Sequence, residues 1–302
     1  MRKKIVKTFF LHLTRIILGC VFIFSALAKL YAVDNFELYI YSQQLFGFDL
    51  STVIARLIIS AEMAIGLLLI TNLYFKITYK ITLYLLLFFS LFLAFKLIVS
   101  SHGNCNCFGD IIILNPAASL LKNFMLIIML LIIKNSADFQ IRFGKIYFAV
   151  ILIFTLFFPG IFSPPDFIYK KVYQTVPGTG IGSQIHISDT TLNISEGKKV
   201  LAFFSMGCKY CILAAHKISL IADRTNTHEN INYIFFGDER DLENFWDKSQ
   251  SKRFRHTIIP FPEIMHITDG RLPVVFFVEK GFVKQKAAYR DLTEELFLEF
   301  FR

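Results

Sequence analysis

Four of the five cysteines in this 302-residue chain stand in two closely spaced pairs. One residue separates Cys105 from Cys107, and two residues separate Cys208 from Cys211. Cysteines at such spacings can exchange a disulfide or bind a metal ion, and both depend on the thiolate form. The sequence therefore predicts thiol chemistry at two places. The fifth cysteine, Cys20, lies in an apolar stretch, and we expect it to pack without reacting.

The second pair follows a short apolar stretch, residues 200–204, and begins a helical pattern that runs to about residue 222. Free backbone amides and the helix dipole at a helix start stabilise negative charge, so a cysteine there has a stabilised thiolate. We expect Cys208 to be the attacking sulfur and Cys211 to be the buried sulfur that resolves the mixed disulfide.

The first pair lies in residues 101–110, which are rich in glycine and asparagine and predict a tight, exposed bend. A disulfide between Cys105 and Cys107 would close a small, strained ring, and strained disulfides are more easily reduced. This pair is therefore suited to exchange rather than to holding the fold together.

Apolar residues make up 55% of the chain and are concentrated in its first half, which predicts a membrane protein. Each of five apolar stretches is long enough to approach a hydrocarbon core of ~30 Å as a helix. We therefore expect five transmembrane helices, over residues 8–31, 51–73, 78–99, 115–133 and 145–162.

Lysine and arginine gather before the first stretch, between the second and third, and between the fourth and fifth. The positive-inside rule makes these segments cytoplasmic. Both cysteine pairs then share the outer, periplasmic side of a bacterial inner membrane, where disulfides are permitted. The net charge of +9 is explained by this anchoring and a basic C-terminal part, so we expect the lipid bilayer, and no nucleic acid, as a partner.

After the fifth stretch, Pro164 and Pro165 open a linker, and strand and helix patterns then alternate. Strands are expected at 200–204, 231–236, 274–278 and after Gly281, with helices at 208–222, 239–250 and from 292 to the end. The predicted fold class is thus a multidomain membrane protein, a helical bundle followed by an α/β domain. Its expected parts are a four-helix membrane domain (1–135), a fifth helix (136–163), a linker (164–184) and the α/β domain (185–302).

The α/β domain resembles the thioredoxin-like family in its C-x-x-C motif and in Arg271-Leu272-Pro273 directly before a strand. The resemblance implies that Pro273 is a cis-proline that packs against the C-x-x-C and presents backbone to a substrate chain. The tryptophan usual before the motif is replaced by Ser205-Met206-Gly207, so substrate preference is not carried over.

Residues 1–135 resemble the MauE family, a branch of DoxX-like membrane proteins linked to disulfide formation during methylamine dehydrogenase maturation. The resemblance is carried by C-x-C-F-G at 105–109, by F-S-A-L-A-K-L at 24–30, by Glu62 four residues before Gly66, and by Lys122-Asn123. It implies a four-helix membrane domain that takes part in disulfide formation.

Ionisable side chains within apolar helices are costly and usually face a cavity or a partner. Five of them map to the middle or outer half of the helices and are expected to converge beneath the C-x-C bend. Such a positive pocket would lower a thiolate pKa and could hold the polar ring of a membrane quinone. The alternatives are that two of the lysines extend to the interface and that the arginine and glutamate form a structural pair. The five are Lys29, Lys96, Lys122, Arg56 and Glu62.

Together the two pairs predict a membrane thiol-disulfide oxidoreductase, an enzyme in which C-x-x-C and C-x-C exchange electrons to support disulfide formation or maturation of an exported, thiol-containing client. A quinone is the expected electron sink, and no metal is expected. One alternative is a non-catalytic metal-handling or assembly factor in which His102, Cys105 and Cys107 bind a soft ion. The other is a membrane-anchored reductase with an inert membrane half.

Overall fold

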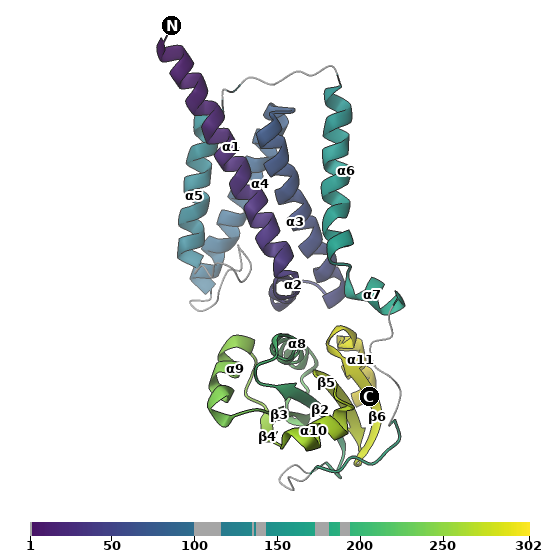
Figure 1. Ribbon diagram of the computed structural model, residues 1–302. Helices are drawn as coiled ribbons and strands as arrows, with labels where there is room; N and C mark the ends of the chain where they lie inside the picture. The colour runs from purple at the N-terminus through teal and green to yellow at the C-terminus, as the bar shows by residue number, and fades with distance from the viewer. Residues whose placement is uncertain (1, 100–115, 135, 137–142, 173–180, 188–193) are drawn as a thin grey trace. The chain divides into compact units, whose positions relative to one another are not determined.

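The computed structural model describes residues 2–99, 116–134, 136, 143–172, 181–187 and 194–302 (Figure 1). Two compact units divide the chain. Residues 1–40 and 52–164 form the first, and residues 41–51 and 165–302 form the second. His102, Cys105 and Cys107 lie outside the described residues.

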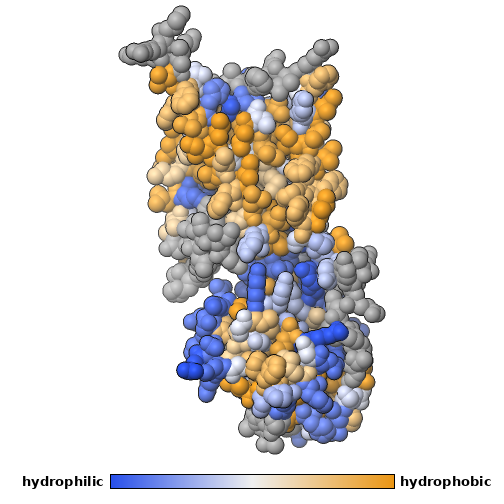
Figure 2. All heavy atoms as spheres, viewed as in Figure 1, coloured by the Kyte–Doolittle hydropathy of each residue, from blue (hydrophilic) through white to orange (hydrophobic). Residues whose placement is uncertain are grey.

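All five predicted apolar stretches are helical. Among the described residues, four helices have the length and hydropathy to span a membrane, and α5 is a shorter apolar helix. Apolar side chains predominate on the visible surface of the first unit (Figure 2), as expected for a multi-pass membrane protein in contact with lipid. The five are α1 (Arg2–Tyr31), α3 (Phe48–Thr71), α4 (Phe75–Val99), α5 (Pro116–Ile132) and α6 (Gly144–Phe162).

A short helix that the sequence analysis did not predict, α2 (Val33–Ser42), follows α1. Val33, Phe36 and Ile40 are buried in one cluster with Ile59 and Met63 of α3. Their spacing of three and four residues places them on one side of α2, so this short helix covers part of α1 and α3.

The helices α1 and α3 approach closely at a pair of glycines. A Cβ atom added to Gly66 would lie 2.8 Å from the carbonyl oxygen of Gly19 and 2.6 Å from Cγ1 of Ile23. A Cβ on Gly19 would lie 2.8 Å from the carbonyl oxygen of Gly66. Small residues that let two backbones approach in this way are typical of helix packing in membranes.

The second unit is built on a five-stranded sheet in the order β4-β3-β2-β5-β6. The strands β2, β3 and β4 are parallel, whereas β5 runs antiparallel to β2 and pairs with β6 as a hairpin. Their bounds are β2 (Lys198–Ser205), β3 (Ile231–Phe236), β4 (Arg255–Ile258), β5 (Val274–Glu279) and β6 (Phe282–Ala288).

Both faces of the sheet are covered. On one face, Phe203 belongs to a buried cluster with Ile264 of α10 (Phe261–Thr268). On the other, Phe204 lies with its ring centroid 5.8 Å from that of Phe245 in α9 (Leu242–Ser249). The remaining helices are α7 (Asp166–Val172), α8 (Lys209–Thr225) and α11 (Glu294–Phe301).

A parallel β2-α8-β3 unit joined to the antiparallel β5-β6 hairpin is the thioredoxin-like arrangement that the sequence predicts. The four predicted strands and the three predicted helices of this domain are present. The sequence analysis missed β4 and α10, which lie between α9 and β5.

Candidate functional site

The C-x-x-C motif lies where β2 passes into α8. Cys208 occupies the N-cap position of α8 and is partly exposed, while Cys211, in the first turn, is fully buried. The backbone N–H of Ser205 donates to Sγ of Cys211 at 3.4 Å. Both sulfurs are present as free thiols. The pair is therefore asymmetric, with one sulfur open to a partner and one enclosed by the fold.

Hydrogen bonding separates the acidities of the two thiols. A hydrogen bond from the Cys211 side chain, helped by the backbone N–H groups of Tyr210 and Cys211, lowers the pKa of Cys208 to about 6, although burial acts against it. That same hydrogen bond and burial raise the pKa of Cys211 far above its ordinary value. At neutral pH Cys208 is consequently a thiolate and Cys211 a thiol, which suits them to attack and resolution.

A surface groove runs beside this motif. Its lining includes Tyr210, between the two cysteines, as well as Leu272 and Pro273 before β5. The Leu272–Pro273 peptide bond is cis, as the thioredoxin-like resemblance implies. The groove thus brings the C-x-x-C motif and the proline segment, which are more than 60 positions apart in the sequence, to one surface where an extended chain can lie.

The start of α7 is held on the second unit by a buried carboxylate. Asp166 is 3% exposed and accepts from Nη1 of Arg290 at 2.6 Å. The ammonium of Lys217, fully buried on α8, lies 3.5 Å from Asp166 and donates to the carbonyl oxygen of Tyr289 at 3.2 Å. Residues 166–172, part of the segment predicted as a linker, therefore form a helix anchored to the thioredoxin-like domain.

The partly buried His216 of α8 is not part of the thiol site. Burial lowers the pKa of His216 to about 4, so the ring is neutral at physiological pH. A neutral ring adds no positive charge to stabilise the Cys208 thiolate.

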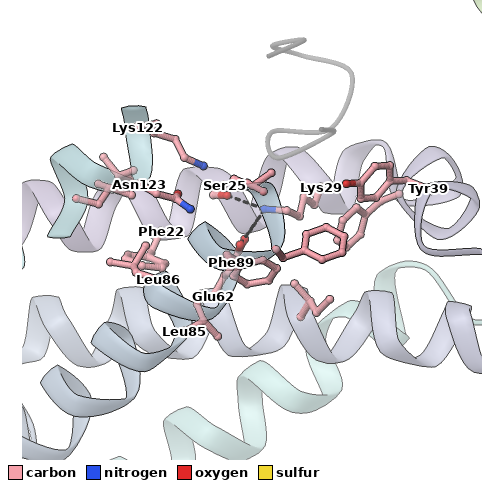
Figure 3. A pocket seen from close by; sticks show the side chains of 16 residues that line it. Phe22, Ser25, Lys29, Tyr39, Glu62, Leu85, Leu86, Phe89, Lys122 and Asn123 are labelled. Carbon is pink, nitrogen blue, oxygen red and sulfur yellow. Dashed lines mark hydrogen bonds and ion pairs between the residues drawn. The ribbon is translucent and has the colours of Figure 1, made fainter. Parts of the chain in front are cut away.

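Within the first unit, Lys29 and Glu62 form a buried ion pair between α1 and α3. Nζ of Lys29 lies 2.7 and 2.9 Å from the two carboxylate oxygens of Glu62 and donates to Oγ of Ser25 at 2.7 Å. Lys122 and Asn123 of α5 line the same cavity (Figure 3). Three of the five predicted charged residues are thus brought to one place.

The other two predicted charges lie elsewhere in the same unit. Arg56 pairs with Glu37 of α2 at 2.5 Å and donates to the carbonyl oxygen of Ser163. It does not pair with Glu62, so the alternative of a structural pair between those two is wrong. Lys96 donates to the hydroxyl of Tyr39 at 3.3 Å and lies over its ring. Sequence reasoning missed Glu37 because it did not recognise α2.

Metal binding through the described residues finds no support, because no cluster of three or more histidine, cysteine or acidic side chains occurs among them. The set proposed for a soft ion includes His102, Cys105 and Cys107, which fall outside those residues. Cys20 is exposed on α1 and belongs to the membrane unit, whereas the C-x-x-C motif belongs to the other unit.

The comparisons with known proteins bear on both halves. Residues 7–134 match the family model of the methylamine utilisation protein MauE, which confirms the resemblance predicted for the membrane domain. Protein TlpB of Flavobacterium psychrophilum is 25% identical over 316 aligned residues, covering 85% of this chain and 84% of its own length. The similarity to that protein therefore extends through both domains.

Solved structures resemble the C-terminal region. StoA from Bacillus subtilis aligns with 43% of this chain over its whole length, at 18% identity and a TM-score of 0.30. The thioredoxin domain of a thiol-disulfide oxidoreductase from Bacteroides vulgatus aligns with 42% of this chain over its whole length, at 13% identity and a TM-score of 0.33. The fold of this domain is defined by its own strand order, C-x-x-C position and cis-proline rather than by these similarities.

Proposed function

Because a MauE domain and a thioredoxin-like domain are joined in this chain, we propose that the protein is a membrane thiol-disulfide oxidoreductase that supports disulfide formation in exported proteins. The observation that carries the proposal is the C-x-x-C site. A partly exposed Cys208 at a helix start and a buried Cys211 lie beside a groove that can receive a client chain. A site built this way performs disulfide exchange.

In the oxidative direction, a client thiolate attacks the Cys208–Cys211 disulfide and forms a mixed disulfide with Cys208. The second client thiol then displaces Cys208, so the client leaves oxidised and the C-x-x-C is left as a dithiol. Two electrons and two protons have moved from the client to the protein. Since Cys208 is a stabilised thiolate, it is a good leaving group in this step.

The dithiol must next be reoxidised. In our proposal the Cys208 thiolate attacks a Cys105–Cys107 disulfide, and Cys211 resolves the resulting mixed disulfide. The electrons then reside on Cys105 and Cys107 as a dithiol. Orientation from the positive-inside rule supports this transfer, because it assigns both pairs to the periplasmic side of the inner membrane. The electrons then need an acceptor, which we infer to be a membrane quinone.

Trapping the intermediate tests this relay. With Cys211→Ala, the mixed disulfide between Cys208 and the C-x-C pair cannot be resolved and should accumulate in cells. Mass spectrometry of non-reduced peptides is expected to find Cys208 joined to Cys105 or Cys107. The matched control adds Cys20→Ser, which should leave the adduct unchanged.

Two other outcomes distinguish the competing functions. If the adduct is absent while the C-x-C pair is oxidised and free of metal, the relay is wrong and the membrane half serves as an anchor for a reductase. Stoichiometric copper bound to a reduced C-x-C, without disulfide turnover, would identify a metal-handling protein.

A further inference from the structure

The groove beside the C-x-x-C motif is large enough to contact several residues of a client chain. Its volume is about 570 Å³, comparable with ligand sites of about 300–1,000 Å³. Aromatic side chains reach it from separate elements, because Tyr169 belongs to α7, Tyr210 to α8, and Tyr289 follows β6. The rings of Tyr210 and Tyr289 lie 6.3 Å apart between centroids. A client in this groove therefore meets aromatic side chains as well as the reactive sulfur.

The wall of the groove also carries positive charge. Arg271 and Arg290 line it, and none of the described residues that line it is acidic. Arg290 is already engaged, since its Nη1 lies 2.6 Å from Asp166 and its guanidinium lies 4.5 Å from the ring centroid of Tyr169. Arg271 is exposed, and its guanidinium has no ion pair or hydrogen bond within the part of the chain that the structure describes. The charge of Arg271 is therefore available to a bound chain.

The end of α10 fixes the position of Arg271. Two residues with positive φ turn the chain there, Asp269 at 53° and Gly270 at 71°. The backbone N–H of Arg271 then donates to the carbonyl oxygen of Thr268 at 3.2 Å. The neighbouring carboxylate of Asp269 pairs with the ammonium of Lys286 instead, at 3.7 Å. Arg271 is thus held by the backbone just before the cis-proline, and the adjacent carboxylate does not neutralise it.

The charges of a client decide how well it fits beside this arginine. At neutral pH the Cys208 thiolate is negative and repels an acidic side chain of the client. Arg271 offsets that repulsion and repels a basic side chain. In an extended chain, residues two positions apart project to the same side. An Asp or Glu two positions from the client cysteine can therefore face Arg271 while the cysteine faces Cys208.

We propose that the groove selects client segments in which an acidic side chain lies two positions from the reactive cysteine, and that Arg271 recognises this side chain. The inference rests on the proposed function, because it specifies the clients on which the C-x-x-C acts. Arg271 is a specificity residue that contacts the client and takes no part in the transfer of electrons. Exposed ion pairs are weak, so the expected preference is about two- to fivefold.

Peptides with a single cysteine, joined in a disulfide to thionitrobenzoate, test this preference. The protein is full-length, reduced and in nanodiscs, and Cys208 is its only cysteine. The Cys208 thiolate attacks the peptide sulfur, a disulfide between the peptide and Cys208 forms, and thionitrobenzoate leaves as a coloured thiolate. The rate of its release is compared for peptides that differ only in Glu or Gln, placed two positions before or after the cysteine. The background variants are Cys20→Ser, Cys105→Ser, Cys107→Ser and Cys211→Ala.

The measured quantity is the ratio of the rate for the Glu peptide to the rate for the Gln peptide. In one of the two placements, Arg271→Gln should lower this ratio about two- to fivefold. Arg271→Lys keeps the charge and should retain most of the ratio, and added salt should reduce it. The matched control is Arg255→Gln, which removes an exposed charge from the edge strand β4, outside the groove, and should leave the ratio unchanged.

The contrary results are distinct from one another. A ratio that Arg271→Gln does not change in either placement, or that Arg255→Gln lowers equally, would overturn the inference. Equal slowing of the Glu and Gln peptides by Arg271→Gln would show that this arginine has a structural role instead. Failure of the proposed function would look different, because Cys208 would then release thionitrobenzoate from its small symmetrical disulfide but from none of the peptides. Since the background lacks the C-x-C pair, the result does not depend on the relay.

Discussion

At the scale of single residues, the protein separates two chemically identical thiols by where it places them. Cys208 stands at the start of α8 and accepts hydrogen bonds, whereas Cys211 is enclosed and donates one. The lowered pKa of Cys208 means that it is ionised above about pH 6 and protonated below. Its nucleophilicity should therefore rise with pH through that region and level off above it.

The rate of alkylation measures the pH dependence of Cys208 nucleophilicity directly. In the reduced protein, the rate at which iodoacetamide modifies Cys208 should have its midpoint near pH 6. Cys211→Ala removes the hydrogen bond that contributes most to the lowered pKa, so the midpoint should move upward, toward the value of about 8.5 for a free cysteine. Peptide mass spectrometry follows Cys208 alone. A midpoint near 8.5 in both proteins would show that Cys211 does not activate Cys208.

At the scale of elements, the parts with strong patterns were predictable and the short ones were not. Apolar stretches and buried strands such as β2 carry long, continuous signals. In contrast, β4 has only four residues, Arg255–Ile258, and Thr257 alone among them is buried. It pairs along one side only, at the edge of the sheet, so burial imposes little pattern on it.

Sequence reasoning had a similar limit for the charged residues of the membrane unit. Its charged residues could be recognised in the sequence because charge is rare in apolar helices. Their pairing could not, because it depends on helix rotation and on α2, which contributes Glu37. Once Glu37 holds Arg56, Lys29 becomes the partner of Glu62. Thus residue identity was available from the sequence, whereas the division into two pairs required the three-dimensional arrangement.

The crossing of α1 and α3 gives a prediction at this scale. Gly66→Ala places a methyl group against the Gly19 carbonyl oxygen and should cost about 1–3 kcal/mol of unfolding free energy. Gly160→Ala in α6 is the matched control, since a Cβ there meets nothing within 4 Å. Denaturant titration in detergent micelles compares the two. Equal stability in both variants would mean that α1 and α3 can move apart at Gly66 without a loss of unfolding free energy.

At the scale of the whole molecule, the covalent connection between α6 and α7 is shorter than the sequence suggested. Helix α6 ends at Phe162 and α7 begins at Asp166, so residues 163–165 alone join them. Asp166 fixes the start of α7 to the thioredoxin-like domain through Arg290. Although the predicted linker extends to residue 184, its later residues therefore do not lengthen the tether.

In the proposed relay, the length of the tether sets the effective concentration of one thiol pair at the other. Ten Gly/Ser residues inserted between Pro164 and Pro165 should slow internal exchange by roughly five- to tenfold, because effective concentration falls steeply with tether length. Rapid mixing followed by acid quench and alkylation measures the rate of transfer from the C-x-x-C to the C-x-C pair.

The control is the same insert after Gly178, which lies beyond the anchored helix and should leave the rate unchanged. Equal slowing by both inserts would show that α7 is not anchored to the thioredoxin-like domain. No slowing by either would show that transfer occurs between separate copies of the protein.

The Asp166–Arg290 contact also has a consequence for biosynthesis. The two residues are 124 positions apart, and Arg290 lies close to the C-terminal end of the chain. During synthesis α7 emerges long before its partner, so the contact that anchors α7 forms only after nearly the whole domain has been synthesised and folded. In a nascent or truncated chain, α7 is therefore not yet anchored to the thioredoxin-like domain, and the anchor is complete only in the finished protein.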